Sequence, residues 1–361
     1  MNFIKNGGEI IQREIDKAAE DGINSAVIEG KYEIEKTVII PSGFHLILRR
    51  CHLRLADNTF CNIFRNEKCG DLSFGADNPD TDISITGEGG AVLDGGVYNG
   101  LSERNSLKDG RPHISVNNLI LMANVERFEI SGLRLINQRW WAMNFIGCRR
   151  GKIYNVDFCS DSTAVSADGT KSSYLSREKG SYEEIMIKNS DGIDLRCGCH
   201  DIIIDRVTGF TQDDSVALTA LNGTLEQMYL PKGCANGIYN VIIRDVCTAA
   251  YCANVRLLNQ GGTILKNILI DGVMDASKDS PYMDRGEHSV RIGDAHLYGF
   301  RHSEEGETCD ITVRNVYSRA ICAVSLSGVI KGLRCENIVG FDGCGEFIRN
   351  KANLLDSFLP Q

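Results

Sequence analysis

Acidic residues gather in two short segments that lie 22 to 23 residues apart. Asp191 stands in the first, Asn-Ser-Asp-Gly-Ile-Asp, and Asp213 and Asp214 stand side by side in the second, Gln-Asp-Asp-Ser. If the chain returns on itself with that period, the three carboxyl groups meet, and their mutual repulsion raises some of their pKa values. A protonated carboxyl beside ionised ones provides the two partners of general acid/base catalysis. We therefore predict that Asp191, Asp213 and Asp214 are catalytic.

Other interpretations of these residues stay open. Asp191-Gly192 is also common turn chemistry, and Asp194 is assigned to that structural class or to hydrogen bonding within the coil. Clustered carboxylates suit calcium, although the spacing is not that of an EF-hand loop. The run from Cys197 to His200 is too tightly spaced for the usual zinc knuckle. We expect neither a bound metal nor a cofactor.

The elements that would position these residues repeat as a four-residue phrase of apolar, polar, polar and apolar residues. The phrase occurs at residues 130–133, 153–156, 204–207, 243–246, 270–273, 313–316 and 335–338. Successive phrases are 23, 51, 39, 27, 43 and 22 residues apart. The short intervals define one coil, and the long ones correspond to a coil with an insertion.

The residues between the phrases favour strands over helices. Short β-branched runs such as 201–204 and 240–243 have Asn, Asp or Gly at their ends, and the chain has only 6 prolines. The dense leucine signature of a leucine-rich repeat is absent. We therefore predict an all-β solenoid of stacked parallel strands, with adjacent coils about 4.8 Å apart. Asp191 and the Asp213–Asp214 pair would then lie on neighbouring coils.

The whole chain, residues 1–361, is predicted to form one domain. Residues 8–21 place apolar side chains on one stripe of an amphipathic helix, and a cap over about residues 1–24 would cover the first coil. Polar insertions that interrupt the period are expected to emerge on one face, which is often the binding face. They span about residues 160–184, 222–236, 276–287 and 294–307.

The composition of the chain limits the classes of molecule that the protein is expected to bind. The net charge of -9 argues against nucleic acid, and the chain has no apolar run long enough to cross a membrane. Its first residues lack the apolar core of a signal peptide, so we expect a cytoplasmic protein. The 14 cysteines are scattered over a long chain, which favours free thiols over a disulfide framework. The sequence leaves the oligomeric state open.

The paired acidic segments resemble those of glycoside hydrolase family 28, the polygalacturonase type. Its Asn-Thr-Asp-Gly and Gln-Asp-Asp motifs stand here as residues 189–192 and 212–214, and the glycine-rich stretches 85–90 and 93–96 and residues 137–148 are similar as well. The resemblance covers about residues 10–340. It implies a right-handed parallel β-helix and an inverting hydrolase. Asp213 would be the general acid, Asp191 and Asp214 would activate water, and Asn189 and Gln212 would bind substrate.

Two motifs of that family are altered. The Gly-His-Gly expected one coil after Asp214 falls at residues 251–254, where no histidine stands, and Arg-Ile-Lys appears as Arg291-Ile292-Gly293. Arg291 remains a candidate for binding a carboxylate or vicinal hydroxyls. Arg256, Arg285, His288 and His296 are candidates to replace the missing lysine, although each could also be a surface residue or a satisfied donor. Trp141 is a candidate platform for a sugar ring, with its neighbour Trp140 packed in the core.

The leading functional prediction is a glycoside hydrolase acting on oligosaccharides that are plant-derived, such as cell wall polysaccharide fragments, or otherwise acidic or rich in deoxy sugars. One alternative is a carbohydrate-binding β-helix that performs no hydrolysis. Another is a β-helix lyase or epimerase, and a pectate-type lyase would require calcium and a basic residue. In each case the predicted partner is a carbohydrate.

Overall fold

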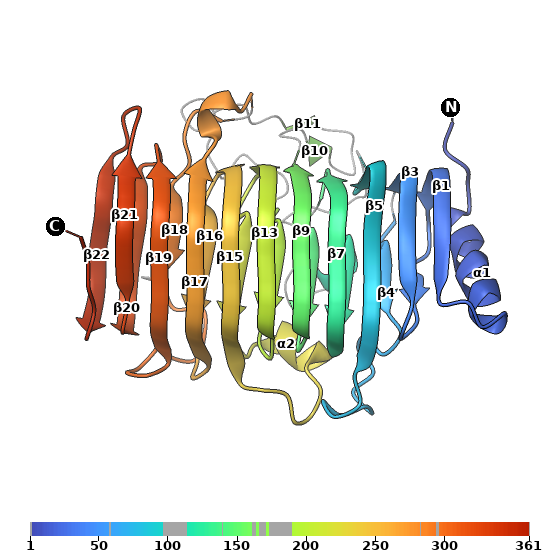
Figure 1. The fold of residues 1–361 in the computed structure, drawn as a ribbon, viewed down its shortest axis with the longest axis horizontal. Helices are drawn as coiled ribbons and strands as arrows, with labels where there is room; N and C mark the ends of the chain where they lie inside the picture. The colour runs from blue at the N-terminus through green and yellow to red at the C-terminus, as the bar shows by residue number, and fades with distance from the viewer. Residues whose placement is uncertain are drawn as a thin grey trace.

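The computed structural model describes residues 2–57, 59–96, 114–138, 140–160, 164–165, 171–172, 190–281, 283–293 and 296–360. Within these residues, twenty strands form one continuous sheet in which neighbouring strands run parallel (Figure 1). The only antiparallel pairing between strands of the described chain joins the two-residue strands β10 (Ala164–Val165) and β11 (Lys171–Ser172). The predicted all-β parallel β-helix is confirmed.

The strands stack in two columns of ten, and each coil contributes one strand to each column. The first column contains β1 (Ser25–Ile34), β3 (His45–Leu55), β5 (Asp80–Asp94), β7 (Val125–Ile136), β9 (Arg149–Cys159), β13 (His200–Thr211), β15 (Gly237–Ala250), β17 (Ile264–Asp275), β19 (Thr308–Ser318) and β21 (Arg334–Gly340). The second contains β2 (Val38–Ile40), β4 (Phe64–Asn66), β6 (Ile120–Ala123), β8 (Met143–Ile146), β12 (Ile193–Arg196), β14 (Val216–Ala220), β16 (Ala253–Asn259), β18 (His288–Ile292), β20 (Cys322–Lys331) and β22 (Glu346–Leu355).

The repeated four-residue phrase marks a bend inside the first-column strands. Its third residue has a left-handed backbone conformation, with φ between 48° and 84°, in all seven occurrences: Gly132, Asn155, Arg206, Asp245, Gly272, Asn315 and Asn337. Glycine, asparagine and aspartate tolerate this conformation best, which explains their frequency at the bend. Some of these side chains also bond from coil to coil, as Asn337 Nδ2 does to Asn315 Oδ1 at 2.8 Å.

The core consists of apolar ladders that run through the stack. In the second column, one ladder contains Ile193, Val216, Val255, Val290 and Val324, which are paired in register on successive strands. All five side chains are fully buried. Because side chains alternate across a strand, the residues next to this ladder point outward, and they include the charged residues of the candidate site.

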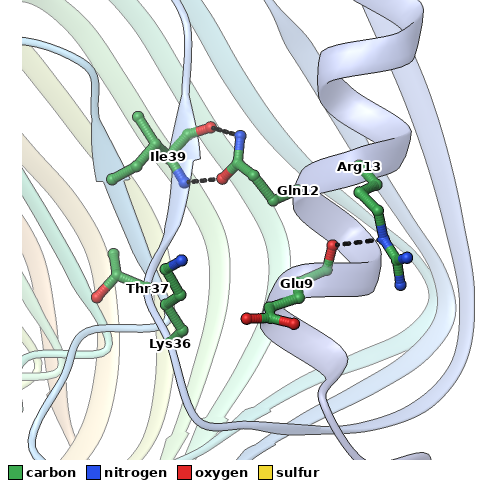
Figure 2. A pocket seen from close by; sticks show the side chains of 7 residues that line it. Glu9, Gln12, Arg13, Lys36, Thr37 and Ile39 are labelled. Carbon is green, nitrogen blue, oxygen red and sulfur yellow. Dashed lines mark hydrogen bonds between the residues drawn. The ribbon is translucent and has the colours of Figure 1, made fainter.

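The first coil is covered by helix α1 (Gly7–Glu20), which confirms the predicted cap. Ile11 and Ile15 are fully buried against the coil. Gln12 completes the edge of β2: its side-chain oxygen accepts from the Ile39 amide at 2.7 Å, and its Nε2 donates to the Ile39 carbonyl at 3.2 Å (Figure 2). A hollow of about 460 Å³ lies beside this contact. It belongs to the capped end of the stack, several coils from the acidic cluster (Figure 1).

The described insertions leave the stack at two edges, on either side of the second-column strands, and whether they border one face stays a prediction. Residues 222–236 follow a second-column strand and contain helix α2 (Thr224–Tyr229), whereas 276–287 follow a first-column strand and contain the short 3-10 helix η3 (Ser277–Asp279). Figure 1 shows α2 at the lower edge and the 276–287 loop at the upper edge. Residues 161–163, 166–170 and 173–184 of the first predicted insertion, and 294–295 of the fourth, lie outside the described residues.

Two further features of the fold are the state of the cysteines and the lengths of the helices. All fourteen cysteines carry unbonded thiols in the structure. Among the described residues, the helices are too short and too polar to cross a bilayer. A second 3-10 helix, η1 (Ile114–Asn117), leads into β6.

Candidate active site

The structure brings the three candidate aspartates together on two adjacent coils. Ile193 of β12 pairs with Val216 of β14, so Asp191 and Asp214, each two residues earlier, lie side by side. The Gly192 amide donates to the Asp214 carbonyl at 2.9 Å and holds this register. Asp191, Asp213 and Asp214 are only 6%, 7% and 8% exposed. Their carboxyl groups therefore share one poorly hydrated region.

Burial and like charge change how these carboxyls titrate. Burial, followed by the charges of Asp194, Asp213 and Asp214, raises the pKa of Asp191 well above its ordinary value. Burial and the neighbouring Asp213 raise the pKa of Asp214 to about 8, although Arg256 and Arg291 oppose the shift. Such groups titrate as a set. Asp191 and Asp214 therefore retain protons at neutral pH.

Asp194 is a fourth member of this acidic cluster. It was expected to play a structural part, and it is fully buried and ion-paired on its own strand. Burial raises its pKa to about 7, against the pull of Arg196. One oxygen each of Asp191, Asp194 and Asp214 is buried without a hydrogen-bond partner within the described part of the chain. A buried carboxylate oxygen without a hydrogen-bond partner destabilises the folded protein. A purely structural site is therefore not expected to contain three of them.

Arg196 supplies the nearest positive charge, and the sequence analysis missed it. Its guanidinium lies 3.2 Å from Asp194 and 3.1 Å from Glu226 of α2. The same group lies 3.7 Å above the ring of Trp141, within the range of a cation–π contact. The spacing of Asp194 and Arg196 on one strand puts both on the same face, so this pair was detectable. Glu226 carries no local signal, because only the fold of the insertion brings it here.

The side chain of Trp141 is packed against its neighbours in the interior of the structure. It is 4% exposed, it meets Trp140 edge to face at a centroid distance of 6.5 Å, and Arg196 covers a face of its ring. Trp140 is fully packed, as expected, at 1% exposed. A sugar could stack on the covered face of Trp141 only after Arg196 moved. Its part as a sugar platform stays a prediction.

Two arginines stand in a column beyond the aspartates. Ala217 of β14 pairs with Arg256 of β16, which pairs with Arg291 of β18. Arg256 is 7% exposed and Arg291 is half-buried. Both act on Asp214, since both lower its pKa. The predicted substrate-binding arginines therefore lie next to the acidic cluster on successive coils.

Cys252 occupies the position beside Asp213 on the next coil, in the segment where the histidine of the resembling family was expected. Its thiol forms a hydrogen bond with the Asp213 side chain, and burial together with the nearby carboxylates raises the pKa of the thiol well above its ordinary value. The thiol therefore stays protonated and acts as a donor. The sequence analysis noted the missing histidine but not this substitute.

His288 begins β18 in register with Ala253 and is 7% exposed. Burial and the charge of Arg291 lower the pKa of His288 to about 4, so the ring is neutral at neutral pH. Gln212 is 3% exposed and directly precedes Asp213. Asn189, the remaining candidate, lies outside the described residues. Across the described part of the chain, no three His, Cys, Asp or Glu side chains are arranged to hold a metal ion.

Part of the chain is similar in sequence to a known family of glycoside hydrolases. The model of glycosyl hydrolases family 28 matches residues 67–238, a segment that includes Asp191, Asp213 and Asp214. A sequence search finds no match among curated proteins.

Solved structures share the fold. A polygalacturonase from Erwinia carotovora is 15% identical with a TM-score of 0.58, covering 98% of this chain and 94% of its own. An exopolygalacturonase from Thermotoga maritima is 14% identical with a TM-score of 0.51, covering 96% and 88%. The tailspike protein of E. coli bacteriophage HK620, solved with a pentasaccharide, is 11% identical with a TM-score of 0.53, covering 94% and 60%. At these identities the likeness concerns the fold. The match to family 28 covers residues 67–238, just under half of the chain, and the solved structures share its parallel β-helix fold.

Proposed function

We propose that this protein hydrolyses the O-glycosidic bonds of acidic, polygalacturonan-like oligo- or polysaccharides with inversion at the anomeric carbon. The observation that carries the proposal is the buried cluster of Asp191, Asp213 and Asp214, in which Asp191 and Asp214 hold protons at neutral pH beside Arg256 and Arg291. Hydrolysis needs one protonated and one ionised carboxyl at the same bond, and a cluster of coupled carboxyls supplies both forms.

Asp213 is the general acid in this proposal. It donates its proton to the glycosidic oxygen as the bond from that oxygen to the anomeric carbon breaks. Cys252 positions the Asp213 carboxyl through its thiol, and Asp214, with a pKa of about 8, is the adjacent group from which the proton can be replaced. The leaving sugar departs with a hydroxyl group.

Asp191 and Asp214 hold the attacking water on the opposite side of the sugar. Once Asp214 has passed its proton to Asp213, its ionised carboxylate takes a proton from the water as the water oxygen bonds to the anomeric carbon, which restores the proton count of the cluster. Inverting enzymes keep acid and base about 6.5–9.5 Å apart to admit the water. Aspartates on coils about 4.8 Å apart reach this separation when their side chains diverge.

The column of Arg256 and Arg291 supports an acidic substrate. A guanidinium offers a planar pair of donors that matches a carboxylate, and two of them follow one another on adjacent coils. The family's lysine is replaced by Gly293, so the second arginine is the residue that compensates for its charge.

The test is release of reducing sugar from a panel of polygalacturonate, oligogalacturonides, rhamnogalacturonan and neutral glucans. We expect turnover of an acidic member of the panel and a loss of about 100-fold or more in kcat for Asp213→Asn. Asp245→Asn is the matched control, because Asp245 is an exposed aspartate at a strand bend and its substitution should leave kcat unchanged. An unsaturated, ultraviolet-absorbing product would instead identify a lyase, and binding without turnover would identify a carbohydrate-binding protein.

A further inference from the structure

A second hollow, of about 550 Å³, opens on the upper edge of the stack. Two loops line it: residues 277, 278, 280 and 283–285, between β17 and β18, and residues 319 and 321, between β19 and β20. The Asp213–Asp214 loop joins β13 to β14 in the same way. The loops of the hollow and the loop of Asp213 and Asp214 therefore belong to one row, because each follows the end of a first-column strand.

Three cationic side chains, Lys278, Arg285 and Arg319, line this hollow, against Asp284 as the acidic lining residue. Asp342 lies 3.5 Å from both Lys278 and Arg319. These surroundings leave an excess of positive charge among the described lining residues. An anion entering the hollow would meet that excess.

Hydrogen bonds to backbone carbonyls hold the guanidinium groups of Arg319 and Arg285 in place. Arg319 Nη1 donates to the Asp284 carbonyl at 2.7 Å, and Arg285 Nη1 donates to the Gly343 carbonyl at 2.7 Å. The Arg319 side chain is only 13% exposed, and its Nε lies 3.5 Å from Asp342 Oδ2. Donors that are already oriented lose little entropy when they bind a carboxylate.

The hollow is joined to the coil of the acidic cluster by packing. Met283, which lines it, packs against Phe210 and Ala249. Phe210 is in β13, whose end leads directly to Asp213. The two loops of the hollow belong to the second and third coils after the one that carries Asp213. At about 4.8 Å per coil, the hollow begins roughly 10 to 14 Å along the stack from the acidic cluster.

We propose that this hollow is a distal subsite that binds a carboxylate of the same acidic glycan, two to three sugar units from the bond that is cleaved. This inference rests on the proposed function and adds a preference for longer acidic chains. A pyranose unit is about as long as one coil spacing, so a chain lying along the stack places successive sugars on successive coils. Lys278 and Arg285 bind the distal carboxylate, with Arg319 behind them.

The experiment compares how tightly digalacturonate and hexagalacturonate bind, by calorimetry, in an Asp213→Asn background that prevents turnover. In Lys278→Gln/Arg285→Gln, we expect the advantage of hexagalacturonate over digalacturonate to fall about tenfold, as for the loss of charge-assisted hydrogen bonds. Lys152→Gln/Lys266→Gln is the matched control, since it removes two exposed cations from β9 and β17. It should leave the advantage intact.

The outcomes separate this inference from the proposed function. If the chain with Asp213 intact cleaves hexagalacturonate but the length preference survives in Lys278→Gln/Arg285→Gln, the distal subsite is refuted and hydrolysis stands. If hexagalacturonate binds with a length preference that the double variant removes, yet is never cleaved, the subsite stands and hydrolysis fails. An equal loss for both ligands, or no binding of either, overturns the subsite.

Discussion

The aspartates of the acidic cluster are held where an isolated carboxylate is unstable. Asp191, Asp194 and Asp214 are almost completely buried, and their own like charges surround them. The arginines nearby compensate only in part, because the pKa of Asp214 remains near 8 despite Arg256 and Arg291. A strained arrangement of this kind is expected where acid/base chemistry is performed and is unusual in a purely structural coil.

The charge of Arg291 leads to a prediction about the titration of a single residue, Asp214. Because Arg291 lowers the pKa of Asp214, its removal in Arg291→Gln should raise that pKa further. The alkaline limb of kcat, where the cluster loses its proton, should move to higher pH, and KM for an acidic substrate should rise. Arg291→Lys keeps the charge and should keep the limb in place while KM still rises. A pH–rate profile in which the alkaline limb of Arg291→Gln coincides with the parent's would contradict this electrostatic role.

The sequence could predict the three aspartates but not all of their surroundings. Their spacing matched one coil, and the stack is regular enough to bring them together. Cys252 and Glu226 were missed for different reasons. Cys252 was detectable only by following the register one coil further, whereas Glu226 reaches Arg196 through an insertion whose fold no periodicity describes.

At the scale of elements, the bends and the short strands differ in how well the sequence specifies them. The seven phrases each place a left-handed residue where a first-column strand turns, and this chemistry is visible in the residue types. Second-column strands are as short as the three residues of β2, too short to show alternation. Their register follows from the first column, since both strands of a coil move together.

Arg196 connects three elements, which gives a prediction about stability. It joins β12 to α2 through Glu226 and packs on Trp141, and it is 6% exposed. Arg196→Met fills a similar volume but leaves Asp194 and Glu226 without their cation. We expect the free energy of unfolding to fall by about 3–5 kcal/mol in chemical denaturation.

Lys331→Gln is the comparison for this experiment, because the exposed ion pair between Lys331 and Glu305 should contribute nothing measurable. A combined Arg196→Met/Glu226→Gln variant should recover part of the lost stability, since it also removes one stranded carboxylate. Equal stabilities for Arg196→Met and the parent would show that the buried network is not needed to hold α2 in place.

At the scale of the whole molecule, the packed core of the stack stabilises the fold and offsets the destabilisation caused by burying the acidic cluster. Apolar ladders such as the one from Ile193 to Val324 run through the core without interruption. The insertions leave this ladder intact, because they lie in loops between strands. The period of the sequence predicted the ladder, whereas the edge from which each insertion emerges depended on which column preceded it.

The raised pKa of Asp214 predicts that stability depends on pH. The folded protein keeps a proton on Asp214 up to about pH 8, whereas the unfolded chain releases it near the ordinary value of 3.8. Stability is therefore lost as the pH rises through this window. His288 acts in the opposite sense, but only below its ordinary pKa of 6.5. Between pH 6.5 and 8 the melting temperature should fall, and Asp214→Asn should reduce the fall.

Asp245→Asn serves again as the exposed control and should retain the slope of the parent. The slope is measured by thermal denaturation in buffers of constant ionic strength. A parent melting temperature that rises between pH 6.5 and 8 would mean that the acidic cluster is ionised in the folded protein.

The anomeric configuration of the first-formed product tests the central claim most directly. Proton NMR of an oligogalacturonide digest, recorded before mutarotation, distinguishes the two anomers as they appear. Direct attack by a water held by Asp191 and Asp214, with the proton supplied by Asp213, predicts a product of inverted configuration, and that signal should vanish in Asp213→Asn. A product of retained configuration, or an Asp213→Asn enzyme that turns over an unactivated substrate at the parent's rate, would contradict the account.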